Sequence, residues 1–217
     1  MDVELSYCVV NTDQRQLLNY CLDAIARERA TVDFETETLV LDNASWDGSA
    51  DAARSHPVTT DVLAVDRRYD RGEAASALLR RARGRFCLLL NEDSELEPGA
   101  TVALHGALAE AADAGAAGAT LVSPDGTQQP SAWRFPSPAT ALLSLVGLKR
   151  RFVVQSHGPR VRGVDWAPAA ALLVRRDAAE AVDWLDAGEV EFCRRLHHNG
   201  WRVLYVPEAR AVHHDEQ

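Results

Sequence analysis

The chain has 217 residues, of which 47% are hydrophobic and 25% charged, a composition typical of one globular domain with a substantial core. A net charge of −9 argues against nucleic-acid binding. The four cysteines show no C-x-x-C spacing, which argues against a zinc site and fits reduced thiols in a cytosolic protein. The acidic start is unlike a signal peptide, and no run of 18 apolar residues occurs. A cytoplasmic location is therefore expected.

Apolar segments alternate with helical patterns through the first half of the chain. Strands are predicted over residues 5–10, 38–41, 62–65 and 86–90. Helices are predicted after Asp13 and after Ser49, each acting as an N-cap, and over residues 74–83 and 98–114. This alternation is typical of an α/β protein with a mainly parallel sheet.

The second half of the chain is less regular. A strand is predicted over residues 117–122, followed by a turn at 124–126 and a helix over 139–148. A basic loop over 149–162 leads to a strand over 164–174 that is interrupted near Pro168. The last elements are a helix over 189–198, a strand over 202–206 and a short extended piece over 211–213.

Two predicted strands end abruptly in acidic turns. The strand over 86–90 runs into NEDSE at 91–95, and the strand over 38–41 runs into DNASWDGS at 42–49. Parallel strands of an open sheet bring their carboxyl ends to one ligand-binding edge. Carboxylate oxygens there suit Mg²⁺ or Mn²⁺, which usually serve phosphate substrates. The pattern suggests a nucleotide-sugar enzyme, whereas a solvated acidic turn is the simpler alternative for either segment alone.

Several segments, in chain order, resemble motifs of the inverting nucleotide-sugar glycosyltransferases of family 2, especially their rhamnosyltransferase-like branch. They are VVNTD at 9–13, LDNASWDGS at 41–49, LNEDSEL at 90–96, SPDGTQ at 123–128, VDWAPAAALLVRR at 164–176 and GWRVLYVPEAR at 200–210. The resemblance implies a single GT-A-like α/β domain over 1–217, with a mixed, mainly parallel sheet flanked by helices. Residues 1–115 would form its nucleotide-binding half and residues 116–217 its acceptor half.

The resemblance also implies roles for individual residues. Nucleotide contacts are expected from Asn11, Asp42, Asn43, Ser45, Asp70, Asn91 and Glu92. A Mg²⁺ or Mn²⁺ site is expected at Asp93 and His213, and acceptor contacts at Asp165 and Trp166. Asp42 would bind the base or ribose, although turn formation is an alternative role, and a solvated surface position is the alternative for His213.

The implied reaction is inverting transfer of a sugar, in cell-wall or polysaccharide biosynthesis. The donor is a UDP-, GDP- or TDP-sugar, and the acceptor hydroxyl belongs to a glycan, a lipid-linked sugar or a small molecule. The general base of the family is an Asp, but the segment here reads GEVEFCRRL at 188–196. Glu189 takes that position and Glu191 is a second catalytic candidate, although acids also suit a helix N-terminus. The extra methylene moves the carboxylate by about 1 Å.

Other departures also affect the expected acceptor side. The loop before Glu189 is short, YDRGEA at 69–74 replaces an Asn- and Gly-rich segment, and APAA at 167–170 replaces a Gly-containing turn. These changes leave open the alternative that the chain is a catalytically degenerate relative that binds a nucleotide or a protein partner.

Basic residues gather in the expected acceptor half, in KRR at 149–151 with Arg160 and Arg162. They fit an anionic lipid-linked acceptor or a peripheral contact at the inner membrane face, and a solvated loop is the alternative. Because the chain ends soon after His214, acceptor choice is expected to rest on a partner or a homodimer interface.

Overall fold

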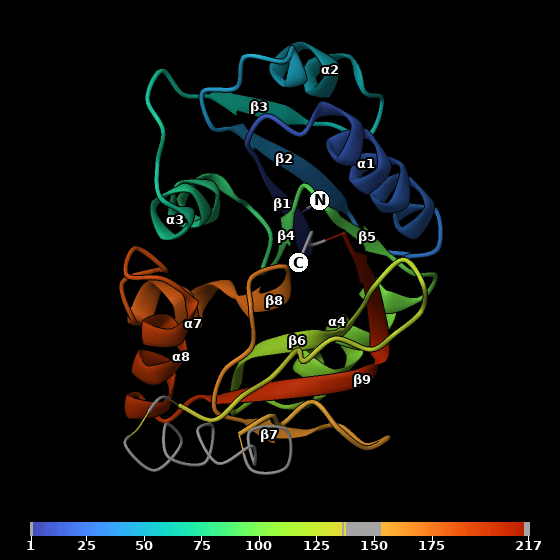
Figure 1. Ribbon diagram of the computed structural model, residues 1–217. Helices are drawn as coiled ribbons and strands as arrows, with labels where there is room; N and C mark the ends of the chain where they lie inside the picture. Colours follow the sequence, from blue (N-terminus) through green and yellow to red (C-terminus); the bar gives the residue numbers. More distant parts are fainter. Residues whose placement is uncertain (1, 136, 138–152, 215–217) are drawn as a thin grey trace.

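The computed structural model describes residues 2–135, 137 and 153–214 (Figure 1). Within this part of the chain, nine strands form one sheet in the order β3-β2-β1-β4-β8-β6-β9-β5, and β7 pairs with β9. The strands are β1 (Leu5–Asn11), β2 (Thr36–Asp42), β3 (Asp61–Ala64), β4 (Phe86–Asn91), β5 (Ser94–Leu96), β6 (Ala114–Val122), β7 (Arg162–Val164), β8 (Ala171–Arg175) and β9 (Arg202–His213). The helix predicted over 139–148 and the basic segment 149–151 lie outside the described residues.

The N-terminal half of the sheet is parallel. Strand β1 pairs in parallel with β2 and β4, and β2 pairs in parallel with β3. The register places Asn11 opposite Asp42 and Val10 opposite Asn91. The polar strand ends therefore lie at one edge of the sheet, as the sequence predicted.

The C-terminal half of the sheet is mixed. Strand β8 lies antiparallel between β4 and β6, whereas β6 and β9 are parallel. The short β5 and β7 each pair antiparallel with β9. The prediction of one α/β domain with a mixed, mainly parallel sheet is confirmed.

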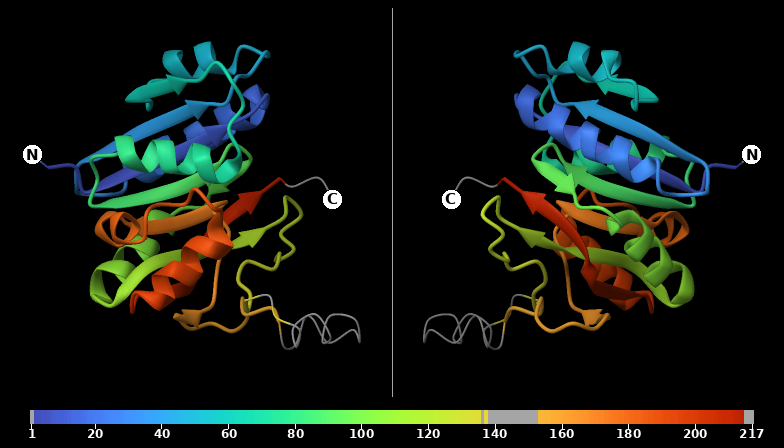
Figure 2. Two further views of the ribbon diagram at one scale, coloured as in Figure 1. Left: turned by 90° about the vertical axis from the view of Figure 1, so that its left-hand side faces the viewer. Right: turned by 90° about the vertical axis from the view of Figure 1, so that its right-hand side faces the viewer.

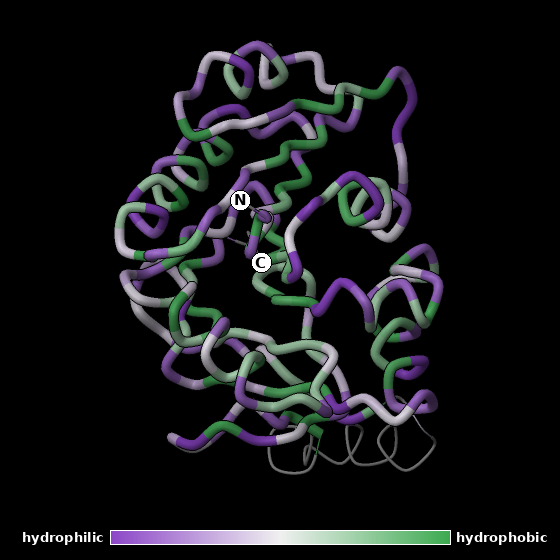
Figure 3. Tube along the Cα trace, turned by 180° about the vertical axis from the view of Figure 1, so that it is seen from behind, coloured by the Kyte–Doolittle hydropathy of each residue, from purple (hydrophilic) through white to green (hydrophobic). Residues whose placement is uncertain are grey.

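Helices cover both faces of the sheet (Figures 1 and 2). The helices are α1 (Arg15–Arg29), α2 (Ser49–Ser55), α3 (Arg71–Arg81), α4 (Ala100–Glu110), α7 (Arg176–Ala181) and α8 (Glu189–His198). The apolar sides of α1 and α4 pack in one core cluster, and those of α3, α7 and α8 pack in a second. Figure 3 shows the hydrophobic segments concentrated in the strands between them. Burial on both faces explains why β4, β6 and β8 are almost entirely apolar.

Two predicted helix caps are wrong. Helix α1 has Gln14 as its N-cap residue, while Asp13 adopts a φ of 54° and accepts a hydrogen bond from the backbone N–H of Trp46 at 2.7 Å. Ser49 is the first residue of α2 and donates its backbone N–H to Asp47 at 3.0 Å. Both aspartates therefore connect the loops at the strand ends.

Strand β9 is longer than predicted. It continues through Pro207 to His213, with a register shift against β6 between Ala119 and Thr120. This irregularity accommodates the proline, which cannot donate to the ladder, and the strand then pairs with β5. The interruption predicted near Pro168 is confirmed: the segment forms two strands, β7 and β8, on either side of this turn. None of the described helices combines the length and apolarity needed to cross a bilayer.

Candidate active site

A cleft of about 740 Å³ opens at the carboxyl edge of the sheet. Its floor is formed by the ends of β1, β4 and β6, and its walls by the start of α3, the turn at 166–170, the start of α8 and the end of β9. Six of the residues predicted from the sequence line it: Asn43, Asn91, Glu92, Trp166, Glu189 and His213.

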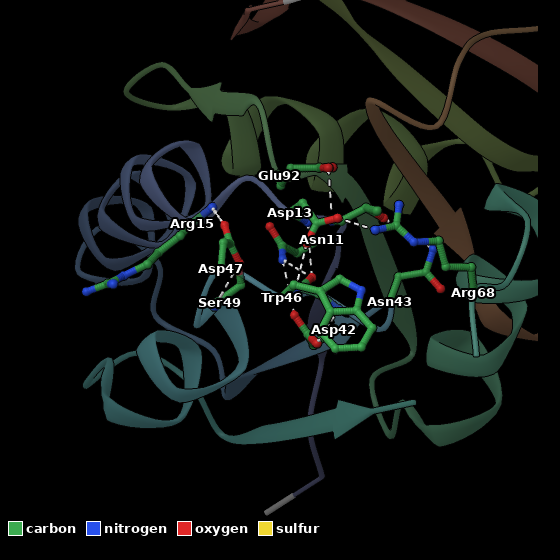
Figure 4. Close-up of polar contacts among 12 residues, drawn as sticks. Asn11, Asp13, Arg15, Asp42, Asn43, Trp46, Asp47, Ser49, Arg68 and Glu92 are labelled. Carbon is green, nitrogen blue, oxygen red and sulfur yellow. Dashed lines mark hydrogen bonds and ion pairs between the residues drawn. The ribbon is translucent and has the colours of Figure 1, made fainter. Parts of the chain in front are cut away.

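Beside the cleft, the loops after β1 and β2 are joined by a buried polar network (Figure 4). The amide of Asn11 donates to Asp42 and to the hydroxyl of Ser45, both at 3.2 Å. Asp42 also accepts the backbone N–H of Ser45 at 3.2 Å and is only 3% exposed. These three predicted nucleotide contacts therefore hold one another in place and do not line the cleft.

The side chain of Asn43 fixes the segment that leads into α3. It donates to the carbonyl of Tyr69 at 3.1 Å and accepts the N–H of the same residue at 2.7 Å. It also donates to the hydroxyl of Thr12 at 3.2 Å. Asp70, predicted as a nucleotide contact, is the N-cap of α3 and accepts the N–H of Glu73 at 2.8 Å. Asp70 thus starts the helix and does not line the cleft.

Charged side chains of both signs face the cleft near its floor. Glu92 accepts the backbone N–H of Thr12 at 3.1 Å, and Arg71 lines the cleft from the first turn of α3. Burial raises the pKa of the Glu92 carboxyl above its usual value, and the neighbouring Asp93 adds to this effect. Arg71 opposes the shift by favouring the charged carboxylate.

Asp93 and His213 meet because β5 and β9 pair. The register places Ser94 opposite His213, and the backbone N–H of His214 donates to the carbonyl of Asp93 at 3.0 Å. The Nε2 atom of His213 then lies 3.5 Å from Oδ1 of Asp93. Among the described residues, this Oδ1 is a buried oxygen without a hydrogen-bond partner.

This pair fits a divalent cation that completes its coordination with substrate. Two ligands bound at about 2.1 Å and at right angles lie about 3 Å apart, close to the observed separation. No group of three His, Cys, Asp or Glu residues suited to a metal is found in the described part of the chain. Mg²⁺ sites often use only one or two protein carboxylates together with phosphates and water. The orphaned oxygen of Asp93 and the facing imidazole match that type of site.

The start of α8 brings one acidic side chain to the cleft. Glu189 lines the cleft, and no hydrogen bond to its carboxylate occurs among the residues that the structure describes. Glu191 lies two positions further on and forms an ion pair with Arg194 at 3.0 Å. Two positions correspond to about 200° around a helix, so the two side chains point to different sides. The structure does not bring Glu191 into the cleft.

Close packing against α3 positions the short loop before Glu189. A Cβ at Gly72 would lie 2.5 Å from the carbonyl oxygen of Leu185 and 2.9 Å from the backbone nitrogen of Gly188. The N–H of Leu185 donates to the hydroxyl of Ser76 at 2.9 Å. Helix α3 therefore forms the wall next to this shortened loop.

Two stacked indoles also line the cleft. The rings of Trp133 and Trp166 lie 4.5 Å apart at 20°, and both line the cleft. Their backbones exchange two hydrogen bonds of 3.0 and 3.1 Å. Asp165 accepts the backbone N–H of Phe135 at 2.8 Å, so this predicted acceptor contact holds the segment that carries Trp133.

No protein-family model matches the chain. It is 28% identical over 201 residues to the N-acetylglucosaminyl-diphospho-decaprenol L-rhamnosyltransferase of Mycobacterium tuberculosis, in strains CDC 1551 and H37Rv. The match covers 81% of this chain and 66% of the relative, so the chain spans just under two thirds of the relative's length.

Solved glycosyltransferase structures share the fold. GalNAc-T7 with UDP, GalNAc and Mn²⁺ has a TM-score of 0.73 at 12% identity, over 99% of this chain and 44% of that one. The mannosyltransferase PcManGT from Pyrobaculum calidifontis, with GDP-Man and Mn²⁺, has a TM-score of 0.69 at 18% identity, over 100% of this chain and 58% of that one. S. aureus TarS 1-349 with UDP-GlcNAc has a TM-score of 0.67 at 14% identity, over 99% of this chain and 60% of that one.

The predicted resemblance to family 2 glycosyltransferases of the GT-A fold is confirmed. Within this GT-A domain, the sequence did not point to five polar or aromatic residues that line the cleft: Thr12, Gln14, Arg71, Gln129 and Trp133. Gln129 directly follows the SPDGTQ segment, which is the only local signal for it. The other four reach the cleft through tertiary packing, for which the sequence carries no short-range pattern.

Proposed function

We propose that the chain is a metal-dependent glycosyltransferase that moves a sugar from a nucleotide diphosphate-sugar to an acceptor hydroxyl with inversion. The observation that carries this proposal is that His213 and Glu189 line one cleft at the carboxyl edge of the sheet, with Asp93 facing His213 at 3.5 Å. The names of the mycobacterial relative and of the GT-A structures support the reaction class.

Residues 1–115 form the donor half in this proposal. Asp42 is the proposed contact for the base or ribose, and Asn11 and Ser45 hold it in place. Asn43 and Asn91 orient the nucleotide from the cleft wall. The guanidinium of Arg71 suits the diphosphate, because a planar cation binds phosphate oxygens in pairs.

Asp93 and His213 hold Mg²⁺ or Mn²⁺ in this proposal. The cation would neutralise the charge that develops on the departing nucleoside diphosphate. Glu92, whose pKa burial raises, lies beside this site and takes part in nucleotide binding.

Glu189 is the general base of the proposed reaction. Its carboxylate takes the proton from the acceptor hydroxyl as that oxygen bonds to the anomeric carbon and the bond to the diphosphate breaks on the opposite face. Attack opposite the leaving group inverts the configuration.

Residues 116–217 form the acceptor half. The stacked Trp133 and Trp166 give a flat apolar surface on which a sugar ring of the acceptor stacks. The relative's name specifies a lipid-linked sugar diphosphate as acceptor, which makes an anionic lipid-linked sugar the acceptor class to test first. Of the two described residues of the basic group, Arg160 is exposed, whereas Arg162 packs on the ring of Tyr205. Arg160 is therefore the one of these two that is available to such an acceptor or to a membrane surface.

Thermal-shift measurements test the proposal directly. UDP, GDP and TDP, and their sugars, are added with and without Mn²⁺ to the wild type and to Asp93→Asn. A nucleotide at about 100 times its dissociation constant raises the melting temperature by about 5–10 °C. The proposal requires a Mn²⁺-dependent shift in the wild type that Asp93→Asn loses, followed by transfer to a lipid-linked sugar. A shift without transfer to any acceptor would favour the degenerate nucleotide-binding alternative, and no shift would favour a protein-binding role.

A further inference from the structure

Gln129 makes three polar contacts at the end of β9. Its Nε2 atom donates to the carbonyl of His213 at 3.1 Å and to the hydroxyl of Ser123 at 3.0 Å. Its Oε1 atom faces Nδ1 of His213 at 3.1 Å. The side chain therefore contacts both the backbone and the imidazole of the residue that faces Asp93.

The carbonyl of His213 fixes which way the Gln129 amide points. If the amide were turned around, Oε1 would face that carbonyl oxygen, and two acceptors would lie in contact. The observed orientation is thus the one that satisfies the network. Because Oε1 can only accept, Nδ1 of His213 must carry the hydrogen in this contact.

The hydrogen on Nδ1 determines the state of the other ring nitrogen. In a neutral imidazole with Nδ1 protonated, Nε2 carries a lone pair, and here Nε2 lies 3.5 Å from the unpartnered Oδ1 of Asp93. Two acceptor atoms that face each other in this way are stabilised by a cation bound to both. We propose that Gln129 is a positioning residue that keeps His213 in the tautomer able to share a divalent cation with Asp93.

Loss of Gln129 would let the pair satisfy itself without a metal. Once Nδ1 has no acceptor, a hydrogen on Nε2 can bond to Oδ1 of Asp93, and this tautomer blocks both cation ligands. Mutation of a residue that hydrogen-bonds to a metal-bound histidine typically lowers the metal affinity 10- to 100-fold. We expect Gln129→Met, which keeps the size but removes the polar atoms, to weaken Mn²⁺ binding by about this factor.

The first readout needs neither metal nor activity. The ¹⁵N shifts of the His213 ring, assigned with His213→Gln, report the tautomer at about pH 8.5, where an ordinary imidazole is neutral. We expect a protonated Nδ1 in the wild type and in Gln129→Glu, which keeps an acceptor oxygen. Gln129→Met should move the hydrogen to Nε2. An unchanged tautomer in Gln129→Met would overturn the proposal.

The second readout is the Mn²⁺ affinity, measured by electron paramagnetic resonance with Mn²⁺ alone and with UDP, GDP or TDP added. Gln128→Met is the matched control, because Gln128 donates to the carbonyl of Ser156 and the hydroxyl of Tyr205 but not to His213. Wild-type affinity in Gln128→Met and weakened affinity in Gln129→Met support the proposal, which rests on the metal site of the proposed function. If Gln129→Met and the wild type bind Mn²⁺ with equal affinity, the proposal for Gln129 is overturned while the metal site stands. If the wild type binds no Mn²⁺, both the proposal for Gln129 and the metal site of the proposed function are overturned.

Discussion

Buried carboxylates and side-chain amides beside the cleft and away from it differ in whether an oxygen is left without a hydrogen bond. Away from the cleft, Glu28 accepts the backbone N–H groups of Gly99 and Thr101 at 2.8 and 2.7 Å. Beside the cleft, Asn11 and Asp93 each keep a buried oxygen that has no hydrogen-bond partner among the described residues. The first arrangement links two structural elements, and the second leaves acceptor oxygens available to a ligand.

This difference separates groups that stabilise the fold from groups that are suited to a ligand. A buried polar atom without a partner costs about 1–3 kcal/mol. Such a cost persists mainly where a water, an ion or a substrate supplies the missing contact. The contrast therefore predicts that substitutions beside the cleft change activity, whereas those at the saturated carboxylates change stability.

Substitution of Glu189 should separate activity from stability most clearly. We expect Glu189→Gln to lower transfer about 10²- to 10⁴-fold, because a positioned base contributes that much. Its melting temperature should stay close to that of the wild type, since the carboxylate forms no hydrogen bond among the described residues. Transfer rates and thermal unfolding check both statements. Glu191→Gln is the control, and equal losses in the two variants would contradict the role of Glu189.

Glu28 should show the opposite behaviour. In Glu28→Ala, the N–H groups at the start of α4 lose their acceptor in a buried environment, so we expect a loss of about 3 kcal/mol in the free energy of unfolding. Denaturant unfolding measures this loss. The exposed Glu110 at the other end of α4 is the control, and Glu110→Ala should stay within about 0.5 kcal/mol of the wild type. A similarly small loss of unfolding free energy in Glu28→Ala would contradict the contrast between the two kinds of buried group.

Local patterns predicted most of the sheet, and the elements they missed depend on distant pairing. The apolar run of β4 and its acidic end are visible in the sequence alone. Strand β5 has three residues and exists because it pairs with residues 211–213. Asp13 was predicted as a cap because of its residue type, but it accepts the backbone N–H of Trp46 and pairs with Arg68. Such long-range partners override a local preference.

Glu37 allows the saturated side of the comparison to be tested by pH. Its carboxylate accepts from the hydroxyl of Ser6 at 2.7 Å and from the backbone N–H and Nε of Arg83 at 2.7 and 2.8 Å. Burial raises its pKa, but these bonds outweigh burial and the net pKa is lowered. Because the pKa is lower in the folded state, the ionised carboxylate stabilises the fold above the unfolded pKa of about 4.3. This stabilisation is lost as the pH falls through the folded pKa.

We therefore expect Glu37→Gln to be less stable than the wild type by about 1–2 kcal/mol at pH 7. The difference should shrink as the pH falls, because both side chains are then uncharged. Urea unfolding at pH 7 and at about pH 3 checks the trend. The exposed Glu35 is the control. A difference that is the same at both pH values would show that the charge of Glu37 is not the cause.

The motifs pointed to His213 and Glu189, which line the cleft, and to Asp93, which faces His213, but they did not distinguish lining residues from supporting ones. Asp42 belongs to a motif, yet it is buried against Asn11 and Ser45. A motif specifies residue types in order, whereas cleft exposure depends on how the loops pack. The same limit explains why Trp133, which has no motif of its own, was not predicted to stack on Trp166.

Trp133 should give the smallest effect, on the acceptor side. We expect Trp133→Ala to raise the KM for a lipid-linked sugar acceptor about 5- to 10-fold, because an aromatic stacking contact contributes about 1 kcal/mol. The KM for the donor and kcat should change little, since Trp133 belongs to the proposed acceptor half and holds no group proposed to react. Trp133→Phe keeps a ring on Trp166 and should retain most of the affinity. Steady-state kinetics with each substrate varied in turn distinguish these outcomes. A loss confined to kcat would show that the indole pair supports the reacting groups and does not bind the acceptor.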